Sequence, residues 1–411
     1  MSRISIAFIF KVFLVLYVVF NMTTLKYSLG LTSISGFANA LLYVLAACVI
    51  CYGLASSKFS PLSGVSLVLV AFLCLTSLLN LFSNFTFTSL IQVIDFLLPW
   101  LALAMVLTNK DVILSNYKSY WDWFNSFLVI VCFVGLCEYI ATFFLGYTMP
   151  IMKLDTGMGE YFVGYSTLLQ KVEGLDIPYF RFQGPFTESG DLAMWASVLV
   201  VYNLFRYQYI YATVLLVAML GAYSPSAFIS LFIALLIYIQ TRSALVMPIM
   251  FILTFFTIGI FMSDITLLYN NVIQMKLGSL SDRASANLDF IEKLPFLINA
   301  YPFGIPLVES TNEKIASGVG FSAYYGPIGS YMVGGLIAFL IYIVFALYYL
   351  FLSAYKLLSK ASLIENELYL YYIMLFTYVV QRGSFFEYAL SPLLFAPIFF
   401  QNFWKKPALN E

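Results

Sequence analysis

Hydrophobic residues follow one another in long runs along this chain, and polar residues are concentrated between the runs. A helix that crosses a bilayer needs roughly 20 apolar residues. The runs predict twelve membrane-spanning helices, at about 4–20, 36–55, 62–82, 88–107, 123–145, 190–206, 207–222, 226–241, 243–262, 323–353, 367–381 and 385–403. We therefore expect an all-α polytopic integral membrane protein, built as a single transmembrane domain over residues 1–411.

Two polar segments are much longer than the other connections, at about 146–189 and 263–322. An even number of spans places both termini on one side of the membrane and both long loops on the other. Loops positioned by a rigid scaffold are where function concentrates. We therefore expect the chemistry of this protein on the face that carries the two loops.

The second long loop contains a predicted short amphipathic helix at residues 281–295. Leu288, Ile291 and Leu294 share one apolar face at helical spacing. Its polar positions are Arg283, Asp289, Glu292 and Lys293. Such a helix lies either on the membrane surface or against the bundle, and the sequence leaves both arrangements open.

Positive charge is distributed unequally between the two sets of loops. The loops opposite the long ones contain ten basic residues: Arg3, Lys58, Lys110, Lys118, Arg206, Arg242, Lys356, Lys360, Lys405 and Lys406. The short loops on the other side contain only Lys26 and Arg382. The positive-inside rule then predicts cytoplasmic termini and outward-facing long loops. No small-residue cleavage site follows the apolar run from Ile4 to Phe20, so we interpret it as a retained first span.

Composition supports this class and narrows the chemistry. The chain is 62% hydrophobic and 10% charged, with a mean hydropathy of +0.92, whereas a soluble domain is about a quarter charged. It has no histidine, the commonest metal ligand. Cys48 and Cys51 form a CxxC without a second pair, inside an apolar run. With no nucleotide-binding or metalloenzyme motif, we expect no metal, no cofactor and no nucleic acid partner.

Three charged residues interrupt the predicted spans: Lys11, Asp95 and Glu138. Charges at membrane depth are costly and are usually paired. We expect a structural pair between Lys11 and a carboxylate. The alternative is a pathway for protons or ions.

The arginines predicted on the long-loop side are Arg181, Arg283 and Arg382. A guanidinium group binds phosphate through a planar fork of donors and keeps its charge. Three arginines around one cavity would suit a lipid-linked diphosphate. The alternative is that they are solvated loop charges or contacts to lipid headgroups.

Arg181 begins an unusually polar entrance to an apolar helix. Gly184 and Gly190 permit close backbone approach, and Pro185 favours a turn. Ser189 or Asp191 is expected to cap the following helix, whose positive end would add to an anion site. Glu188 stands beside these residues as the candidate general base. Tyr179 belongs to a group of loop aromatics that would stack on sugar rings or anchor the chain at the membrane interface.

The residues Arg181 to Phe186, followed by Glu188 and a helix that opens at Leu192, resemble the O-antigen polymerase (Wzy) and O-antigen ligase superfamily. Two further segments fit this resemblance. Gly221–Ser226 resembles the family's serine-containing turn between two helices. The loop that holds Arg283 and ends in Tyr301-Pro302-Phe303-Gly304 looks like its long outer loop, after which Gly329, Gly334 and Gly335 are expected to open a helix.

The resemblance implies a polysaccharide polymerase at the periplasmic face of the bacterial inner membrane. Such an enzyme moves a growing glycan from undecaprenyl diphosphate onto another lipid-linked oligosaccharide repeat unit, without a metal, in O-antigen or capsule biosynthesis. The family's functional arginines correspond to Arg181 and Arg283. The resemblance also implies a polysaccharide chain-length regulator as a partner and membrane lipid around the protein.

We therefore predict Arg181, Glu188 and Arg283 as catalytic residues, and Gly184, Asp191, Arg382 and Tyr179 as substrate-binding residues. The absence of histidine disfavours a ligase, because ligase-type relatives place one after the long loop. A ligase-type transferase and a flippase for lipid-linked oligosaccharides remain as alternatives. A flippase should place several charges along a central cavity, and mid-membrane charge here is almost limited to Lys11.

Overall fold

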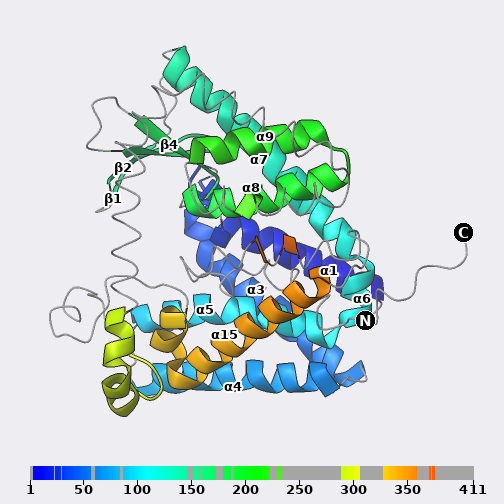
Figure 1. Cartoon of the computed structure of the whole chain (residues 1–411), viewed down its shortest axis with the longest axis vertical. Helices are drawn as coiled ribbons and strands as arrows, with labels where there is room; N and C mark the ends of the chain where they lie inside the picture. The colour runs from blue at the N-terminus through cyan, green and yellow to red at the C-terminus, as the bar shows by residue number, and fades with distance from the viewer. Residues whose placement is uncertain are drawn as a thin grey trace, which may run out of the picture.

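The computed structural model describes residues 3–22, 24–28, 30–56, 61–83, 87–145, 152–156, 159–172, 179–186, 189–222, 230–232, 288–305, 327–358, 370–371 and 373–374. This part of the chain is mostly helical, with a small antiparallel sheet at one end of the long helices (Figure 1).

The helices match the apolar runs of the sequence closely. Their bounds are α1 Arg3–Tyr17, a π-helical turn Val18–Met22, α2 Leu25–Ser28, a 3₁₀ turn Thr32–Ile34, α3 Ser35–Ser56, α4 Pro61–Ser83, α5 Phe87–Thr108, α6 Lys110–Ser115, α7 Tyr117–Phe144, α8 Ser189–Phe205, α9 Tyr209–Ala222 and α15 Pro327–Leu358. A further helix covers residues 288–300. The predicted spans at 226–241, 243–262, 367–381 and 385–403 lie largely or wholly outside the described residues.

Among the residues that the structure describes, three helices are long and apolar enough to cross a membrane: Ser35–Ala55, Tyr117–Thr142 and Gly334–Tyr355. α8 and α9 are apolar but shorter. These lengths and compositions are compatible with a membrane protein.

The first long loop contains a four-stranded antiparallel sheet, so the expectation of an all-α protein is wrong there. Its strands are β1 Met152–Thr156, β2 Gly159–Val163, β3 Leu168–Val172 and β4 Tyr179–Gly184, paired in the order β1-β2-β3-β4. In β4 aromatic and polar residues alternate, as Phe180, Arg181, Phe182 and Gln183. This period of two is typical of a β-strand, and here both Phe182 and Gln183 are buried. The strands were not predicted, because strands of five or six residues leave no mark in a search for apolar runs of roughly 20 residues.

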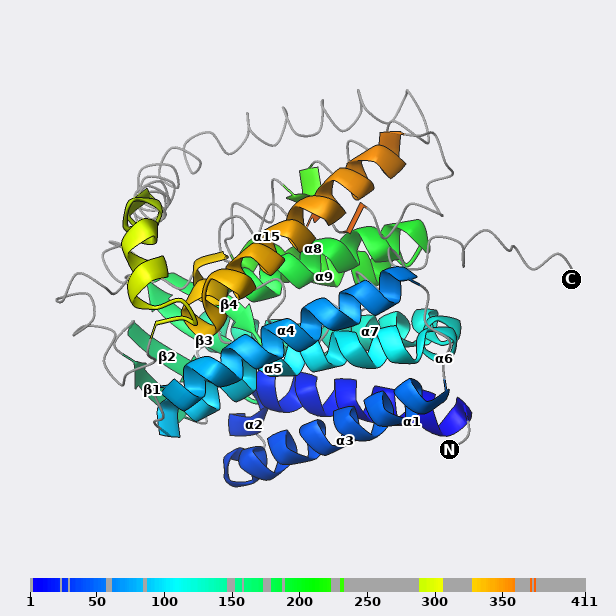
Figure 2. The ribbon, with the colours of Figure 1, turned by 90° about the horizontal axis from the view of Figure 1, so that it is seen from below.

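α8 lies at the centre of the bundle and forms an antiparallel hairpin with α9 (Figures 1 and 2). Every residue from Ser189 to Asn203 is buried, as expected for a helix that is apolar on all sides. The sheet lies at the end of the hairpin where α8 begins and α9 ends, which we call the sheet end (Figure 1). α6 and the turn between α8 and α9 lie at the opposite end.

α15 breaks at Gly335, whose φ of 66° and ψ of −158° are open to glycine alone among the common residues. Gly329 lies in the first turn of α15, which starts at Pro327, and a second helical segment follows the break at Gly335. The prediction that these glycines open a helix therefore agrees with the structure, which adds the break. The backbone around Pro302 fills the break: the Leu336 N–H donates to the Pro302 carbonyl at 3.2 Å. The Asn80 amide of α4 donates to the Met332 carbonyl at 3.1 Å. The interrupted helix thus keeps its backbone groups paired.

The predicted helix in the second long loop is present from residue 288 and continues beyond Pro295 to residue 300, while its predicted first part, 281–287, lies outside the described residues. Phe290 and Leu297 are buried in one cluster with Tyr331 and Met332 of α15. Of the two arrangements that the sequence left open, packing against the bundle is therefore correct for the face that contains Phe290 and Leu297. The predicted common face of Leu288, Ile291 and Leu294 is wrong, since Leu294 packs against the buried cluster while Leu288 and Ile291 are 63% and 61% exposed.

Candidate functional site

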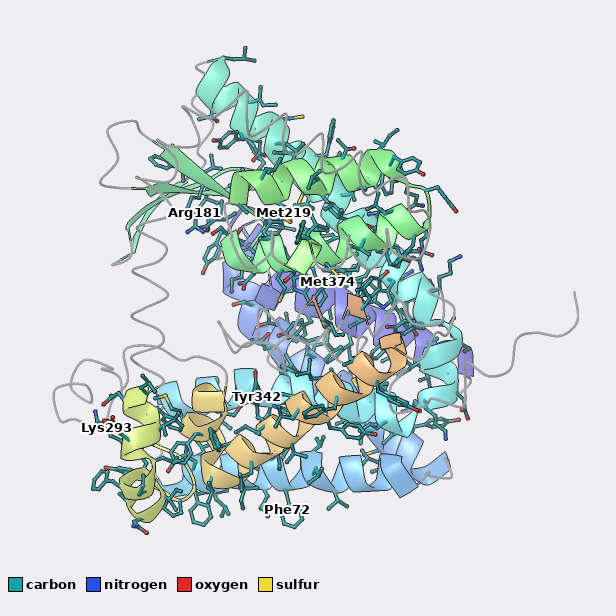
Figure 3. All side chains as sticks on the ribbon, in the orientation of Figure 1. Phe72, Arg181, Met219, Lys293, Tyr342 and Met374 are labelled. Carbon is teal, nitrogen blue, oxygen red and sulfur yellow. The ribbon has the colours of Figure 1, made fainter. Side chains whose placement is uncertain are left out.

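Arg181 lies where β4 meets the ends of α8 and α9 (Figure 3). Its neighbour Phe182 is buried and packs edge-on against the ring of Tyr139 in α7, with centroids 6.2 Å apart. Arg181 is half-buried, and its Nη2 donates to the carbonyl of Ala222 at 3.3 Å. Ala222 is the last residue of α9. A cation is favourable there, because the carbonyl end of a helix carries partial negative charge.

Two segments that are distant in sequence meet at this point. A Cβ atom added at Gly221 would lie 3.0 Å from the Cβ of Phe182, closer than most Cβ atoms approach a neighbour, so α9 packs tightly against β4 at this glycine. Arg181 and Phe182 belong to the first segment of the family resemblance, and Gly221 and Ala222 open the second. Ser224 and Ser226 lie outside the described residues.

Gly184 ends β4 with a φ of +55° and packs against Leu192 in the first turns of α8. The close approach predicted for this glycine is therefore made to the protein's own chain. The carbonyl of the next residue, Pro185, accepts hydrogen bonds from the backbone N–H and the hydroxyl of Thr24. The entrance to α8 is thus fixed to β4 and to the segment that follows α1.

The first turn of α8 contains Ser189, Gly190 and Asp191, all buried. The helix begins at Ser189, so Asp191 lies inside its first turn rather than before it. A carboxylate in the first turn is stabilised by the partial positive charge of the helix end. Asp191 therefore already places negative charge where the sequence predicted an anion site.

The surroundings of four predicted site residues are not described by the structure. Glu188, Arg283 and Arg382 lie outside the described residues. Tyr179 is the first residue of β4 and pairs with Val172 of β3. The proximity of Arg181 to the other two arginines stays a prediction.

Glu138 has a binding role that sequence reasoning missed. It is buried in α7 with 7% of its surface exposed. The Ser166 backbone N–H donates to its two carboxylate oxygens at 3.0 and 3.3 Å. The backbone of Tyr165 and Thr167 and the Ser166 hydroxyl also hydrogen-bond to this carboxylate. Successive N–H groups of this kind form a concave anion-binding loop.

Gly164 makes this contact possible. A Cβ atom at position 164 would lie 2.5 Å from Oε2 of Glu138. The turn between β2 and β3 is therefore anchored directly to α7.

The expected pairing of Lys11 with a carboxylate is wrong for Glu138, whose partners are backbone groups. Three neighbouring backbone groups satisfy a buried carboxylate without the cost of burying a second charge. The side chain of Asp95 lies outside the described ones, so its pairing stays a prediction. The signal in the sequence was the short segment Gly164–Thr167, with its glycine, serine and threonine, between Val163 and Leu168.

The opposite end of the hairpin is held by side chains. Nη1 of Arg206 donates to the carbonyl of Tyr202 at 3.2 Å, and its guanidinium lies 3.5 Å from the centroid of that ring. The Tyr202 hydroxyl donates to Asp122 of α7 at 2.5 Å, and the ring of Trp121 stacks against that of Tyr202 with a centroid distance of 5.8 Å. Asn125 and Asn203 exchange two amide hydrogen bonds of 2.8 Å. These contacts join α7 to α8.

Within the described ranges, no group of three or more His, Cys, Asp or Glu side chains is arranged to hold a metal ion. No protein-family model, no curated protein and no solved structure matches the chain.

Proposed function

We propose that this chain is a polysaccharide polymerase that transfers a growing glycan from undecaprenyl diphosphate onto a lipid-linked repeat unit. The observation that carries the proposal is the junction of Arg181 with Ala222 and of Phe182 with Gly221. These contacts bring together two of the segments on which the family resemblance rests. The proposed setting is the bacterial inner membrane, with about twelve spans and both termini in the cytoplasm.

The distribution of charge supports a periplasmic sheet end. Lys110 and Lys118 belong to α6 and α7 at the opposite end, and Arg206 follows α8 there. Lys26 belongs to α2, next to Thr24, which hydrogen-bonds to Pro185 at the sheet end. This agrees with the excess of basic residues that the positive-inside rule assigns to the cytoplasmic side.

In the proposed reaction, Arg181 binds the diphosphate of the donor, with Arg283 and Arg382 completing the clamp. A hydroxyl of the acceptor sugar attacks the anomeric carbon of the donor while Glu188 takes the hydroxyl proton. The bond between the anomeric carbon and the phosphate oxygen breaks, and its electron pair leaves with undecaprenyl diphosphate. Gly184, Asp191 and Tyr179 form the rest of the binding site. Holding both lipid-linked substrates at one depth makes the attack effectively intramolecular.

The hydrogen bond to Ala222 gives Arg181 a defined direction before substrate arrives. A donor that is already oriented stabilises developing charge without reorganising during the reaction. The cap on α9 and the phosphate contact are therefore compatible roles for one guanidinium, whose planar group has five N–H donors.

The test is complementation of a polymerase-null strain with Arg181→Ala. Losing one oriented donor to the reacting charge typically costs about 10²–10³ in rate, so we expect long-chain polysaccharide ladders to disappear from gels. Arg206→Ala is the matched control: it removes an equal charge from the other end of the same hairpin, and we expect it to keep the ladders.

The two variants must be compared at equal protein abundance. Normal ladders with Arg181→Ala would contradict the proposal. With purified protein and lipid-linked repeat units, formation of glycosidic bonds supports a polymerase. Translocation of the lipid without bond formation would instead identify a flippase.

A further inference from the structure

A tight turn separates two charged residues of the proposed site. Arg181 lies on β4, and Asp191 lies in the first turn of α8. Between them the Phe186 N–H donates to the Gln183 carbonyl at 3.2 Å and closes a four-residue turn. Gly184 supplies the positive φ, +55°, at the second position of this turn. The conformation of the turn therefore helps to set where Arg181 lies relative to Asp191.

Thr24 holds this turn from a distant part of the chain. The carbonyl of Pro185, the third residue of the turn, accepts two hydrogen bonds from Thr24. The backbone N–H donates at 2.5 Å and the hydroxyl at 3.0 Å, although the two residues are 161 positions apart. Thr24 is only 4% exposed, so water has little access to these bonds. One buried residue thus supplies two donors to a single carbonyl of the turn.

Thr24 is itself held on both sides. α1 runs into the π-helical turn Val18–Met22, a rare conformation that is frequent at functional sites. Within it the Asn21 amide donates to the Asn39 side chain of α3 at 3.0 Å. On the other side, the Thr24 carbonyl accepts from the Tyr27 N–H of α2 at 2.9 Å. The donors that reach the turn therefore belong to an anchored segment.

The hydroxyl is the part of this contact that depends on the residue type. Any residue except proline has a backbone N–H that could make the first bond. Only a side chain with a donor at the right distance makes the second, and threonine and serine provide a hydroxyl there. The second hydrogen bond is therefore the one that a substitution at position 24 can remove.

We propose that Thr24 is a positioning residue of the transferase site. Through Pro185 it holds the turn, and with it the spacing of Arg181 and Asp191, in the geometry that the reaction uses. Thr24 touches no substrate and acts only through the turn. A donor stabilises developing charge best when it is already oriented before the reaction. This inference rests on the proposed function, because the site that Thr24 serves is the one assigned there to Arg181.

Thr24→Val is the variant that tests this role, because valine keeps the shape of the side chain and the backbone hydrogen bond. It places a methyl group where the hydroxyl lies 3.0 Å from the Pro185 oxygen. Carbon atoms usually stay about 3.3–3.6 Å from a carbonyl oxygen, so the turn must shift by a few tenths of an ångström. Since a misplacement of about 1 Å can lower a rate about 100-fold, we expect a several-fold loss of rate.

The kinetics are measured with purified full-length protein and lipid-linked repeat units. We expect Thr24→Val to lower kcat several-fold with little change in KM, because the alignment of reacting groups is affected more than binding. Thr24→Ser keeps the hydroxyl and should restore kcat. Thr76→Val is the matched control: Thr76 is buried in α4, and its hydroxyl donates to the Leu73 carbonyl at 3.0 Å. We expect this control to keep the kcat of the unmodified chain.

An unchanged kcat with Thr24→Val would overturn the proposal. So would equal losses with Thr24→Val and Thr76→Val, because the effect would then follow from removing any buried hydroxyl. A loss that Thr24→Ser shares would show that the hydroxyl is not the group that matters. If Thr24→Val does not fold, Thr24→Ala removes the hydroxyl without placing a methyl group against the carbonyl, and the same losses are expected of it.

Hydrogen–deuterium exchange reads the contact without any substrate. The Phe186 N–H closes the turn, so its exchange in detergent, followed by mass spectrometry, reports how firmly the turn is held. We expect Thr24→Val to speed this exchange several-fold, and Thr24→Ser and Thr76→Val to leave it unchanged. Exchange within α3 serves as the measure of overall stability and should not change. Unchanged exchange at Phe186 in Thr24→Val would contradict the coupling.

The results separate this inference from the function on which it rests. Loss of polymer with Arg181→Ala, together with normal kcat in Thr24→Val, would overturn the role of Thr24 and leave the proposed function standing. An unmodified chain that forms no glycosidic bond would overturn both.

Discussion

The two ends of the α8–α9 hairpin are held by different kinds of contact. At the sheet end, glycine backbone lies close against other groups, with Gly164 against the Glu138 carboxylate and Gly221 against the Phe182 side chain. At the opposite end, the contacts of Tyr202 and Arg206 are made by side chains that stack and hydrogen-bond. The glycine contacts at the sheet end depend on the absence of a methyl group. At the opposite end several side-chain contacts act together, so we expect the loss of one to be partly compensated by the others.

The two arginines show this difference most clearly. Arg206 follows α8 directly and binds the carbonyl of Tyr202, four residues before it, a local cap that needs no other element. Arg181 binds a carbonyl 41 residues away, and so ties β4 to the end of α9. We infer that the sheet end has a defined geometry that a site requires, whereas the opposite end supplies stability that tolerates substitution.

The largest expected effect is that of Gly164→Ala. The new methyl group would displace the Glu138 carboxylate from its N–H donors and leave a buried charge poorly satisfied. We expect a loss of about 3 kcal/mol in the free energy of unfolding, measured by thermal unfolding in detergent. Gly36→Ala is the control, because nothing lies within 4 Å of the added Cβ in α3. An unchanged melting temperature with Gly164→Ala would show that the sheet end does not depend on its glycine contacts.

Glu138→Gln should cost less, about 2 kcal/mol. The amide keeps the shape of the side chain but brings an N–H group toward the Ser166 N–H, where two acceptor oxygens stood. Both variants break the same contact, so the double variant should cost less than the sum of the single ones. Strict additivity in a double-mutant cycle would show that Gly164 and Glu138 act independently.

Tyr202→Phe tests the opposite end with a smaller expected effect. It removes the hydrogen bond to Asp122 and keeps the ring against Trp121 and Arg206. We expect a loss of about 1 kcal/mol and unchanged polymer ladders. A loss comparable to that of Gly164→Ala would show that this end is not redundant.

Arg206→Lys should have the smallest effect, about 0.5 kcal/mol or less. Lysine keeps the positive charge at the end of α8 and loses only the planar contact with the Tyr202 ring. Arg181→Lys is the sharper comparison, because a planar fork is needed for two-point binding of phosphate. Loss of polymer with Arg181→Lys, and not with Arg206→Lys, would separate the two arginines by function. Equal activity of both would leave Arg181 as a simple cap.

The lengths of the apolar runs predicted most helix positions correctly. Burial of a long hydrophobic segment is the largest favourable contribution to the free energy of folding, so it decides where such a helix forms. The predicted spans at 36–55 and 62–82 became α3 at Ser35–Ser56 and α4 at Pro61–Ser83. The strands were missed because each is short, and because their stability comes from pairing with neighbours that the sequence does not reveal. The break at Gly335 was missed for a similar reason: the backbone near Pro302 that fills it is more than 30 residues away in the chain.

The candidate site could be predicted only in part. The sequence singled out Arg181, Gly184 and Asp191 by their residue types and their place at a helix entrance. It did not reveal the contact with Ala222, since a backbone carbonyl has no sequence signature. The same holds for Glu138, whose partners are N–H groups that any residue except proline could provide.

The anchor between Glu138 and the turn at Gly164–Thr167 also sets an order for biosynthesis. Glu138 is translated 28 residues before Ser166, and at about 5–20 residues per second the interval is about 1.5–6 seconds. During that time α7 has emerged while the groups that bind its carboxylate do not yet exist. If α7 enters a membrane, it does so with an acidic residue near its end that has not yet met its partners, and completion of the sheet then supplies the contact that holds α7 in place.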